Sequence, residues 1–221
     1  DRRVMIRNTA EYRSRDLSLS ELSTRRQHHV LGLQRRFPML GEQDIEYTWT
    51  GHLSASRSGQ PYFAKVEEGV FAEQAGVDFF GIGEHHTDYF PMPAGDVVLA
   101  AIAARTEKIR LGSAVTVLSS DDPVRVFQRY STLNAVSGGR AEVILGRGSF
   151  TESFPLFGYD LADYDVLFEE KLQLFTRLLD EKPVTWEGTT RAALENADVY
   201  PKTESGRLKT WVGVGGSPQS V

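Results

Sequence analysis

The chain has 221 residues, of which 40% are hydrophobic and 25% charged, a size and composition that suit one soluble globular domain with a sizeable core. Its net charge of −5 gives no general attraction to nucleic acid or anionic membranes, and the absence of cysteine excludes disulfides and thiolate chemistry. No apolar run approaches the roughly 20 residues that span a bilayer, and the N-terminus lacks the apolar core of a signal peptide, so we expect a cytoplasmic protein.

The composition changes near residue 44. Residues 1–43 are polar and rich in arginine, with weak periodicity, whereas strand-like and helix-like patterns alternate over residues 44–221. For residues 1–43 the composition favours a solvated, poorly ordered arm, with an oligomerisation arm or an anion-binding patch as the alternative. We therefore divide the chain into an arm over 1–43 and a domain over 44–221.

Within the domain, apolar and β-branched runs typical of strands alternate with helical spacing of apolar residues. In chain order, the expected elements are a weak strand at 45–50, a helix at 62–75, a strand at 77–82, a helix at 96–106, a strand at 109–118, a helix at 123–137, a strand at 141–145, a helix at 163–180, short strands at 184–186 and 198–200, and a strand at 210–214.

Short polar residues, proline and glycine mark the expected helix ends. Asp96 is expected to cap the second helix, and Asp122 the third, with Pro123 at its first position. Gly138 and Gly139 are expected to end the third helix, because glycine readily takes the left-handed conformation found there.

This alternation with short connections is typical of a parallel α/β fold. The two main closures are a doubly wound open sheet and an eight-stranded (β/α)8 TIM barrel. About five strand–helix units are present, whereas a full barrel needs eight, so the chain is expected to be the front part of a longer domain.

Three titratable residues follow the strand that ends in Gly81-Ile82-Gly83. Histidine exchanges protons near neutral pH, and a neighbouring carboxylate can orient it, so Glu84, His85 and His86 are candidates for acid–base chemistry. A purely structural, hydrogen-bonded role fits the spacing equally well. Zinc is disfavoured, because the sequence shows no third ligand at a typical spacing.

Small residues follow the next strand, at Ser113-Ala114-Val115-Thr116. They permit close approach of a flat ligand, although simple packing inside a barrel explains them more readily when they are taken alone. The next strand ends in Gly146-Arg147-Gly148, where flexible backbone and a guanidinium suit a phosphate; a turn with an exposed arginine is the alternative. Thr151 occupies the third glycine position of a Rossmann fingerprint, so that motif is absent.

The last strand is followed by Gly215-Gly216-Ser217-Pro218. Ser217 can cap a helix that begins with Pro218, and unpaired backbone N–H groups at such a start attract an anion. We favour a phosphate site slightly over an ordinary helix start, since barrels often bind phosphate at late strand ends.

Together these motifs resemble the bacterial luciferase-like monooxygenase family. The resemblance is carried by GVDFFGIGEHH at 76–86, by residues 111–150, and by FPLFGYD at 154–160, and it continues more loosely to residue 221. It implies an α/β TIM barrel, incomplete in this chain, and an oxidoreductase that binds reduced FMN, or in some branches a deazaflavin coenzyme. Many members oxidise a small organic substrate with O2.

The resemblance also implies roles for individual residues. Glu84 and His85 match pocket positions, with His85 as a proposed acid–base group and His86 as a weaker candidate. Ala114 and Val115 match a peptide, often cis, that lies against the flavin ring. The matches to positions near the ring and the phosphate are Gly146, Arg147, Gly216, Ser217 and Ser220.

Some positions depart from the family pattern. Asp165 stands where some relatives carry a second basic phosphate residue, which leaves Arg147 as the main expected counter-charge. Residues 1–43 do not resemble the family, and its last three strand–helix units are unmatched. The leading hypothesis is an FMN-dependent monooxygenase; the alternatives are a deazaflavin-dependent reductase and a non-catalytic flavin-binding or interaction protein. A flavin reductase and a second copy of the chain are expected partners.

Overall fold

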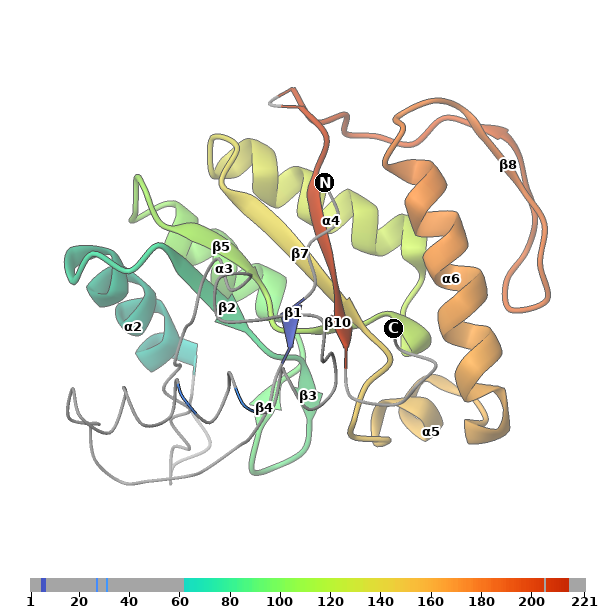
Figure 1. Cartoon of the computed structure of the whole chain (residues 1–221), viewed down its shortest axis with the longest axis horizontal. Coiled ribbons are helices and arrows are strands. Elements are labelled where there is room, and N and C mark those ends of the chain that lie inside the picture. The colour runs from blue at the N-terminus through green and yellow to red at the C-terminus, as the bar shows by residue number, and fades with distance from the viewer. Residues whose placement is uncertain (1–4, 7–26, 28–30, 32–61, 205, 215–221) are drawn as a thin grey trace. The chain divides into compact units, whose positions relative to one another are not determined.

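The structure is a computed structural model and describes residues 5–6, 27, 31, 62–204 and 206–214 (Figure 1). The chain divides into two compact units, one formed by Ala55–Gly213 with Asp1–Arg3 and the other by Val4–Ser54 with Val214–Val221. In the second unit the short strand β1 (Met5–Ile6) is described. The expected strand at 45–50 lies outside the described residues.

The first unit alternates strands and helices along the chain. Its strands are β2 (Phe79–Ile82), β3 (His85–His86), β4 (Pro91–Met92), β5 (Arg110–Ser113), β6 (Thr116–Val117), β7 (Ala141–Gly146), β8 (Val184–Trp186), β9 (Leu194–Ala197) and β10 (Lys209–Val214). Its helices are α2 (Tyr62–Gln74), α3 (Gly95–Ala103), α4 (Pro123–Val136), α5 (Ser153–Phe157) and α6 (Tyr164–Leu178), with short 3-10 turns at Leu118–Ser120 and Leu161–Asp163.

Four of these strands form a parallel sheet in the order β10-β7-β5-β2, and β6 extends the pairing beside β7. Among the described residues the sheet is open and does not close into a barrel. The expected α/β class with an incomplete barrel is therefore confirmed. Two antiparallel pairs, β3–β4 and β8–β9, lie outside this sheet.

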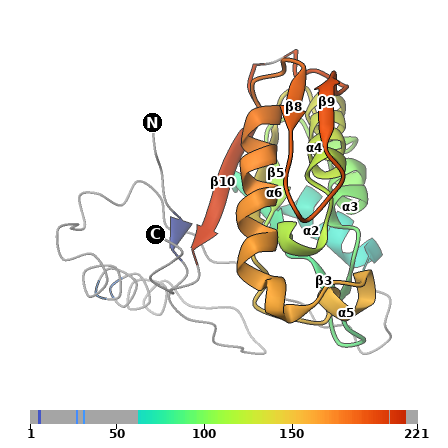
Figure 2. The ribbon, with the colours of Figure 1, turned by 90° about the vertical axis from the view of Figure 1, so that its right-hand side faces the viewer.

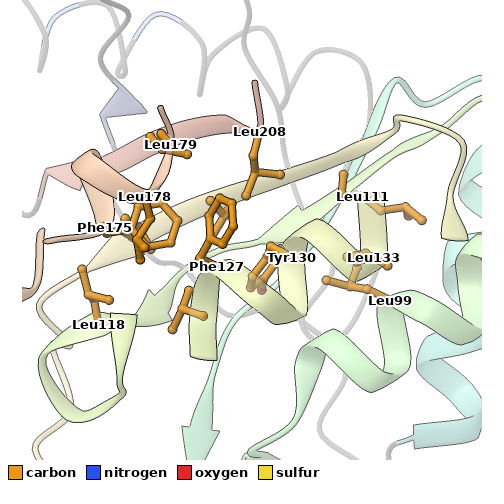
Figure 3. Packing of buried hydrophobic residues seen from close by; sticks show 14 of the residues in the cluster. Leu99, Leu111, Leu118, Phe127, Tyr130, Leu133, Phe175, Leu178, Leu179 and Leu208 are labelled. Carbon is orange, nitrogen blue, oxygen red and sulfur yellow. The ribbon is translucent and has the colours of Figure 1, made fainter. Parts of the chain in front are cut away.

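The helices α2, α3, α4 and α6 lie on one face of this sheet and follow one another as neighbours in chain order (Figures 1 and 2). The core fills the space between the helices and the sheet (Figure 3). Its large aromatic members include Phe127 and Tyr130 of α4 and Phe175 of α6. Burial of this apolar surface, at roughly 25 cal/mol per Å², is the main stabilising contribution to the unit.

Most elements agree with the sequence-based expectations, and three need correction. The expected strand at 109–118 is broken into β5, β6 and a 3-10 turn, because the chain turns sharply at Ala114–Val115. The last short strand lies at Leu194–Ala197 rather than 198–200. The residue at the cap position of α3 is Ala94, without a side-chain hydrogen bond, and Asp96 in the first turn instead pairs with Arg129 at 3.4 Å.

Helix α2 packs against the core through smaller side chains and leaves a large one, Phe71, exposed. Phe71 is 70% exposed, whereas Val66 and Ala72 pack against the core, and a Cβ at Gly69 would lie 2.6 Å from Ile102 Cδ1 of α3. The close approach of α2 and α3 therefore depends on a small residue rather than on the phenylalanine. No helix in the described part of the chain is long and apolar enough to cross a membrane.

Asp122 begins α4 as expected, and its replacement has a predictable cost. Its Oδ1 accepts hydrogen bonds from the backbone N–H groups of Val124 at 2.9 Å and Arg125 at 3.2 Å, and its Oδ2 accepts one from Arg191 Nε at 2.8 Å. We expect Asp122→Ala to lower the free energy of unfolding by about 1–2 kcal/mol in urea denaturation followed by circular dichroism. Asp122→Asn keeps the capping oxygen and should lose much less; equal losses in the two variants would contradict a capping role.

Candidate functional site

The parallel register brings three of the sequence motifs to one edge of the sheet. Ile82 lies opposite Ser113, so β2 and β5 end together, and Val117 lies opposite Gly146, so β6 and β7 end together a few residues further along the same edge. This edge, where these strands have their carboxyl ends, is called the carboxyl edge below. The residues that follow the strands therefore meet there, which is where ligands bind in parallel α/β folds.

The centre of the carboxyl edge is the dipeptide Ala114-Val115, whose peptide bond is cis, as the resemblance implies. Two hydrogen bonds fix the chain around it: Ala114 N donates to Ile82 O at 2.7 Å, and Glu84 N donates to Val115 O at 3.1 Å. Both partners belong to β2 or follow it directly. The dipeptide is therefore tied by its backbone to the carboxyl end of β2.

Glycines surround this dipeptide on all the strands beside it. On the Ala114 side, a Cβ at Gly81 would lie 3.0 Å from Ala114 Cβ, and one at Gly83 would lie 3.1 Å from Ala114 O. Carbon atoms in optimal contact are about 3.5–4.0 Å apart, so side chains at these positions would press on the dipeptide. Glycine at the third position of β2 and directly after its end therefore leaves the backbone bare beside Ala114.

On the Val115 side the glycines lie even closer to the dipeptide. A Cβ at Gly146 would lie 2.5 Å from Val115 Cγ2, and one at Gly213 of β10 would lie 2.9 Å from Val115 Cγ1. The four glycines Gly81, Gly83, Gly146 and Gly213 are called the glycine bed below. Because they come from three different strands, the bed exists only when the sheet is assembled.

Glu84 is held on the helix side of this edge. Its Oε1 lies 2.9 Å from His86 Nε2, and its Oε2 accepts a hydrogen bond from Val117 N at 3.0 Å. Burial raises the pKa of the Glu84 carboxyl, while the hydrogen bonds from His86 and Val117 act in the opposite direction. A carboxyl with a raised pKa in a strand-end cluster is a typical feature of functional sites.

The structure separates the two residues that the sequence analysis placed together at the reacting edge. Glu84 contacts His86, the weaker candidate, and not His85. The His85 ring instead lies between Phe90 and Phe150, with ring centroids 5.4 Å and 4.7 Å away. The cause is the strand β3, in which successive side chains point to opposite faces.

A cavity of about 330 Å³ opens beside Glu84 and His86. Its other walls come from the start of α3, the loop before α4, and the residues Arg129 and Tyr130 of α4. Burial raises the pKa of Tyr130 to about 12, so its hydroxyl stays protonated and pairs with Thr116 Oγ1 at 3.1 Å. Among the described residues, no group of histidine, aspartate and glutamate side chains could hold a metal ion.

Arg147, the expected counter-charge for a phosphate, has a carboxylate partner. Its Nη1 donates to Asp165 Oδ1 of α6, and its guanidinium lies 5.0 Å from the centre of the Phe168 ring. The Arg147 side chain is 14% exposed and that of Asp165 is 71% exposed. Asp165, noted in the sequence as a departure from a basic residue, therefore neutralises the arginine at this position.

The remaining predicted phosphate residues, Gly216, Ser217 and Ser220, lie outside the described residues. The sequence analysis also missed one polar residue near His85: Glu152, whose Oε1 lies 3.6 Å from His85 Nδ1. No local pattern marks Glu152, because it lies 67 positions along the chain from His85 and only the sheet brings the two loops together.

Known proteins share sequence and fold with this chain. The family model described as luciferase-like monooxygenase matches residues 47–221, which is more than half of the chain. By sequence, the chain is 31% identical over 136 residues to 4-hydroxyprotoasukamycin monooxygenase of Streptomyces nodosus subsp. asukaensis, a match that covers 61% of this chain and 37% of that protein.

Solved structures show the same fold. Monooxygenase RslO1 from Streptomyces bottropensis superposes with a TM-score of 0.67 at 25% identity, over 75% of this chain and 51% of that one. The oxygenating constituent of 3,6-diketocamphane monooxygenase from Pseudomonas putida, in complex with FMN, gives a TM-score of 0.62 at 18% identity, over 76% of this chain and 48% of that one. The chain thus spans about a third of the length of the first curated relatives it matches and about half of these structures.

Proposed function

Because the chain belongs to the luciferase-like monooxygenase family, we propose that it is part of an oxidoreductase that binds FMN and oxidises a small organic substrate with O2. One observation carries this proposal most directly. Ala114-Val115 lies at the carboxyl edge within the glycine bed, where four glycines make room for this dipeptide, and a flat ligand would lie against it. The complex of the related Pseudomonas putida protein with FMN supports the choice of coenzyme.

The residues of this chain fit such a coenzyme. Ala114 and Val115 would support its ring, Arg147 would offer a guanidinium to its phosphate, and His85 would hold or move a proton. Gly216, Ser217 and Ser220 remain predicted phosphate contacts. Bound FMN would supply the redox chemistry, while the protein contributes position, electrostatics and exclusion of water. Glu84, through His86 and Val117, would keep the strand end in place.

The direct test is titration of the protein with FMN, oxidised and reduced, followed by the quenching of flavin fluorescence and by the absorption spectrum. We expect saturable binding, competed weakly by a deazaflavin coenzyme. Stronger binding of the deazaflavin would favour the reductase alternative instead. Binding without O2 consumption in the presence of reduced flavin would favour a non-catalytic flavin-binding protein. Absence of binding by either coenzyme in every redox state would overturn the proposal.

The Arg147–Asp165 pair gives a prediction that isolates the phosphate. Asp165→Asn removes a negative charge beside the guanidinium, so we expect FMN to bind about fivefold more tightly at low salt, which corresponds to about 1 kcal/mol. Riboflavin, which has no phosphate, should bind the variant and the wild type equally. Asp163→Asn, in the same exposed segment, is the matched control. An equal gain for riboflavin would show that Arg147 does not act on the phosphate.

If FMN is bound in its reduced form, a flavin reductase is the expected supplier. A second copy of the chain is the other expected partner, and the mass of the protein in solution tests it. Both follow from the family and not from a contact in the structure.

A further inference from the structure

One nitrogen of His85 is buried without a hydrogen bond. The Nδ1 atom has almost no contact with solvent and no hydrogen-bond partner among the described residues, although the side chain as a whole is 25% exposed. Aromatic rings flank the imidazole, with Phe90 tilted against it and Phe150 edge-on. A buried polar atom without a partner costs roughly 1–3 kcal/mol, so such atoms in native proteins generally call for an explanation.

A carboxylate lies next to this atom. Glu152 Oε1 is 3.6 Å from His85 Nδ1, just beyond a normal hydrogen bond, and the same oxygen accepts from His86 N at 3.5 Å. Glu152 precedes α5 in the loop that leaves β7, whereas His85 lies in the β3–β4 hairpin. The two side chains therefore come from different loops of the carboxyl edge and meet there.

The other charged groups nearby have partners elsewhere. Glu84 contacts His86 and Val117, and Arg147 contacts Asp165. Among the described residues, Glu152 is thus the carboxylate within ion-pair distance of His85. The opposite edge of the imidazole lies near Gly83, since His85 Cδ2 would lie 3.9 Å from a Cβ at that position.

We propose that Glu152 is the positioning residue for His85: its carboxylate accepts a hydrogen bond from Nδ1–H, so that Nε2, which neighbours Cδ2 on the side of the ring near Gly83, carries the lone pair. Which imidazole nitrogen carries the proton is set by the hydrogen bond that the other makes, and a carboxylate at Nδ1 fixes both the tautomer and the ring orientation. The role of this contact in catalysis rests on the proposed function, whereas the predicted tautomer of His85 does not.

The test is the tautomer of His85, read from long-range proton–nitrogen NMR spectra of protein labelled with ¹⁵N-histidine. The measurement uses flavin-free protein at about pH 8.5, where ordinary imidazoles are neutral. His85→Asn assigns the signal among the five histidines. We expect wild type to be mainly the Nδ1–H form, and Glu152→Ala to be mainly the Nε2–H form that is common for free imidazole. Glu195→Ala, at an exposed position of β9, is the matched control and should leave the tautomer unchanged.

A wild-type spectrum dominated by the Nε2–H form would overturn the proposal without any variant, so a poorly folded Glu152→Ala protein does not prevent a decision. An unchanged tautomer in a folded Glu152→Ala variant would overturn it as well. Failure of FMN to bind would contradict the proposed function but would leave this result unaffected, so the two can fail separately.

Discussion

Replacing Gly146 by alanine is expected to weaken FMN binding at least tenfold and to lower the free energy of unfolding by about 1–3 kcal/mol. The added Cβ would lie 2.5 Å from Val115 Cγ2, far inside normal contact distance, and Gly213 lies close to Val115 Cγ1. The side chain and backbone of Ala114-Val115 must therefore shift, at the position where the flavin ring is proposed to lie. Fluorescence titration with FMN and urea denaturation measure the two effects.

The double variant Gly146→Ala/Val115→Ala provides the control. It removes both methyl groups of Val115, so the contact of the new Cβ with residue 115 lengthens from 2.5 Å to the 3.1 Å of its Cβ, and both affinity and stability should recover in part. Phe127→Leu separates the two effects, because this change in the core beneath α4 should lower stability while leaving the affinity of the folded protein unchanged (Figure 3). Equal losses of affinity in Gly146→Ala and Phe127→Leu would argue against a special role of the glycine bed.

Lys171 of α6 should make stability depend on pH in the alkaline range. The side chain is 1% exposed; its Nζ donates to Ser119 O at 2.6 Å and lies 3.9 Å from the centre of the Tyr159 ring. Burial lowers the pKa of Lys171 from 10.5 to about 8, although the charges of Asp121 and Asp122 act in the opposite direction. Such a change in pKa corresponds to roughly 3 kcal/mol.

The direction of the effect follows from proton binding. Below about pH 8 the ammonium is charged in both states and its burial destabilises the folded protein; between about pH 8 and 10.5 the folded protein has already released the proton that the unfolded chain still holds. The wild type should therefore gain up to roughly 3 kcal/mol relative to Lys171→Met as the pH rises through this range. Urea denaturation of both proteins at several pH values measures this difference.

Because other titrating groups are common to the two proteins, their contributions largely cancel in the difference. Lys182→Met, which removes an exposed lysine, should show no comparable dependence on pH. A constant difference between wild type and Lys171→Met from pH 7 to about 10.5 would contradict a buried, charged Lys171.

The main elements of the larger unit could be predicted from the sequence because local signals mark them. The β-branched residues within 109–118, the Asp122-Pro123 start of α4 and the Gly138-Gly139 end each act through backbone preferences that neighbours in the chain determine. The resemblance also placed Glu84, Ala114, Val115 and Arg147 at the carboxyl edge. Alternating strands and helices imply a parallel sheet. In a parallel sheet the strands have their carboxyl ends at the same edge, so the residues that follow them meet there.

Features that depend on tertiary contacts were not predictable in the same way. The strand-like pattern at 109–118 does not show that the strand is interrupted at Ala114-Val115. The interruption depends on contacts with residues of β2 and β7, which are distant in the sequence. The separation of Glu84 from His85 and the approach of Glu152 depend on how two loops meet. Asp96 looked like a cap because carboxylates favour helix starts, but a salt bridge to Arg129 holds its side chain instead.

The glycine bed also bears on how the protein matures during synthesis. Its members extend from Gly81 to Gly213, and the Val115 side is complete only when β10 has paired with β7. Domains form as the ribosome extends the chain, and contacts between distant segments form late. A nascent chain that has exposed β2, β5 and β7 but not yet β10 would hold Val115 on one side only. We therefore expect flavin capture to be a late, post-translational event rather than one that guides the early folding of the sheet.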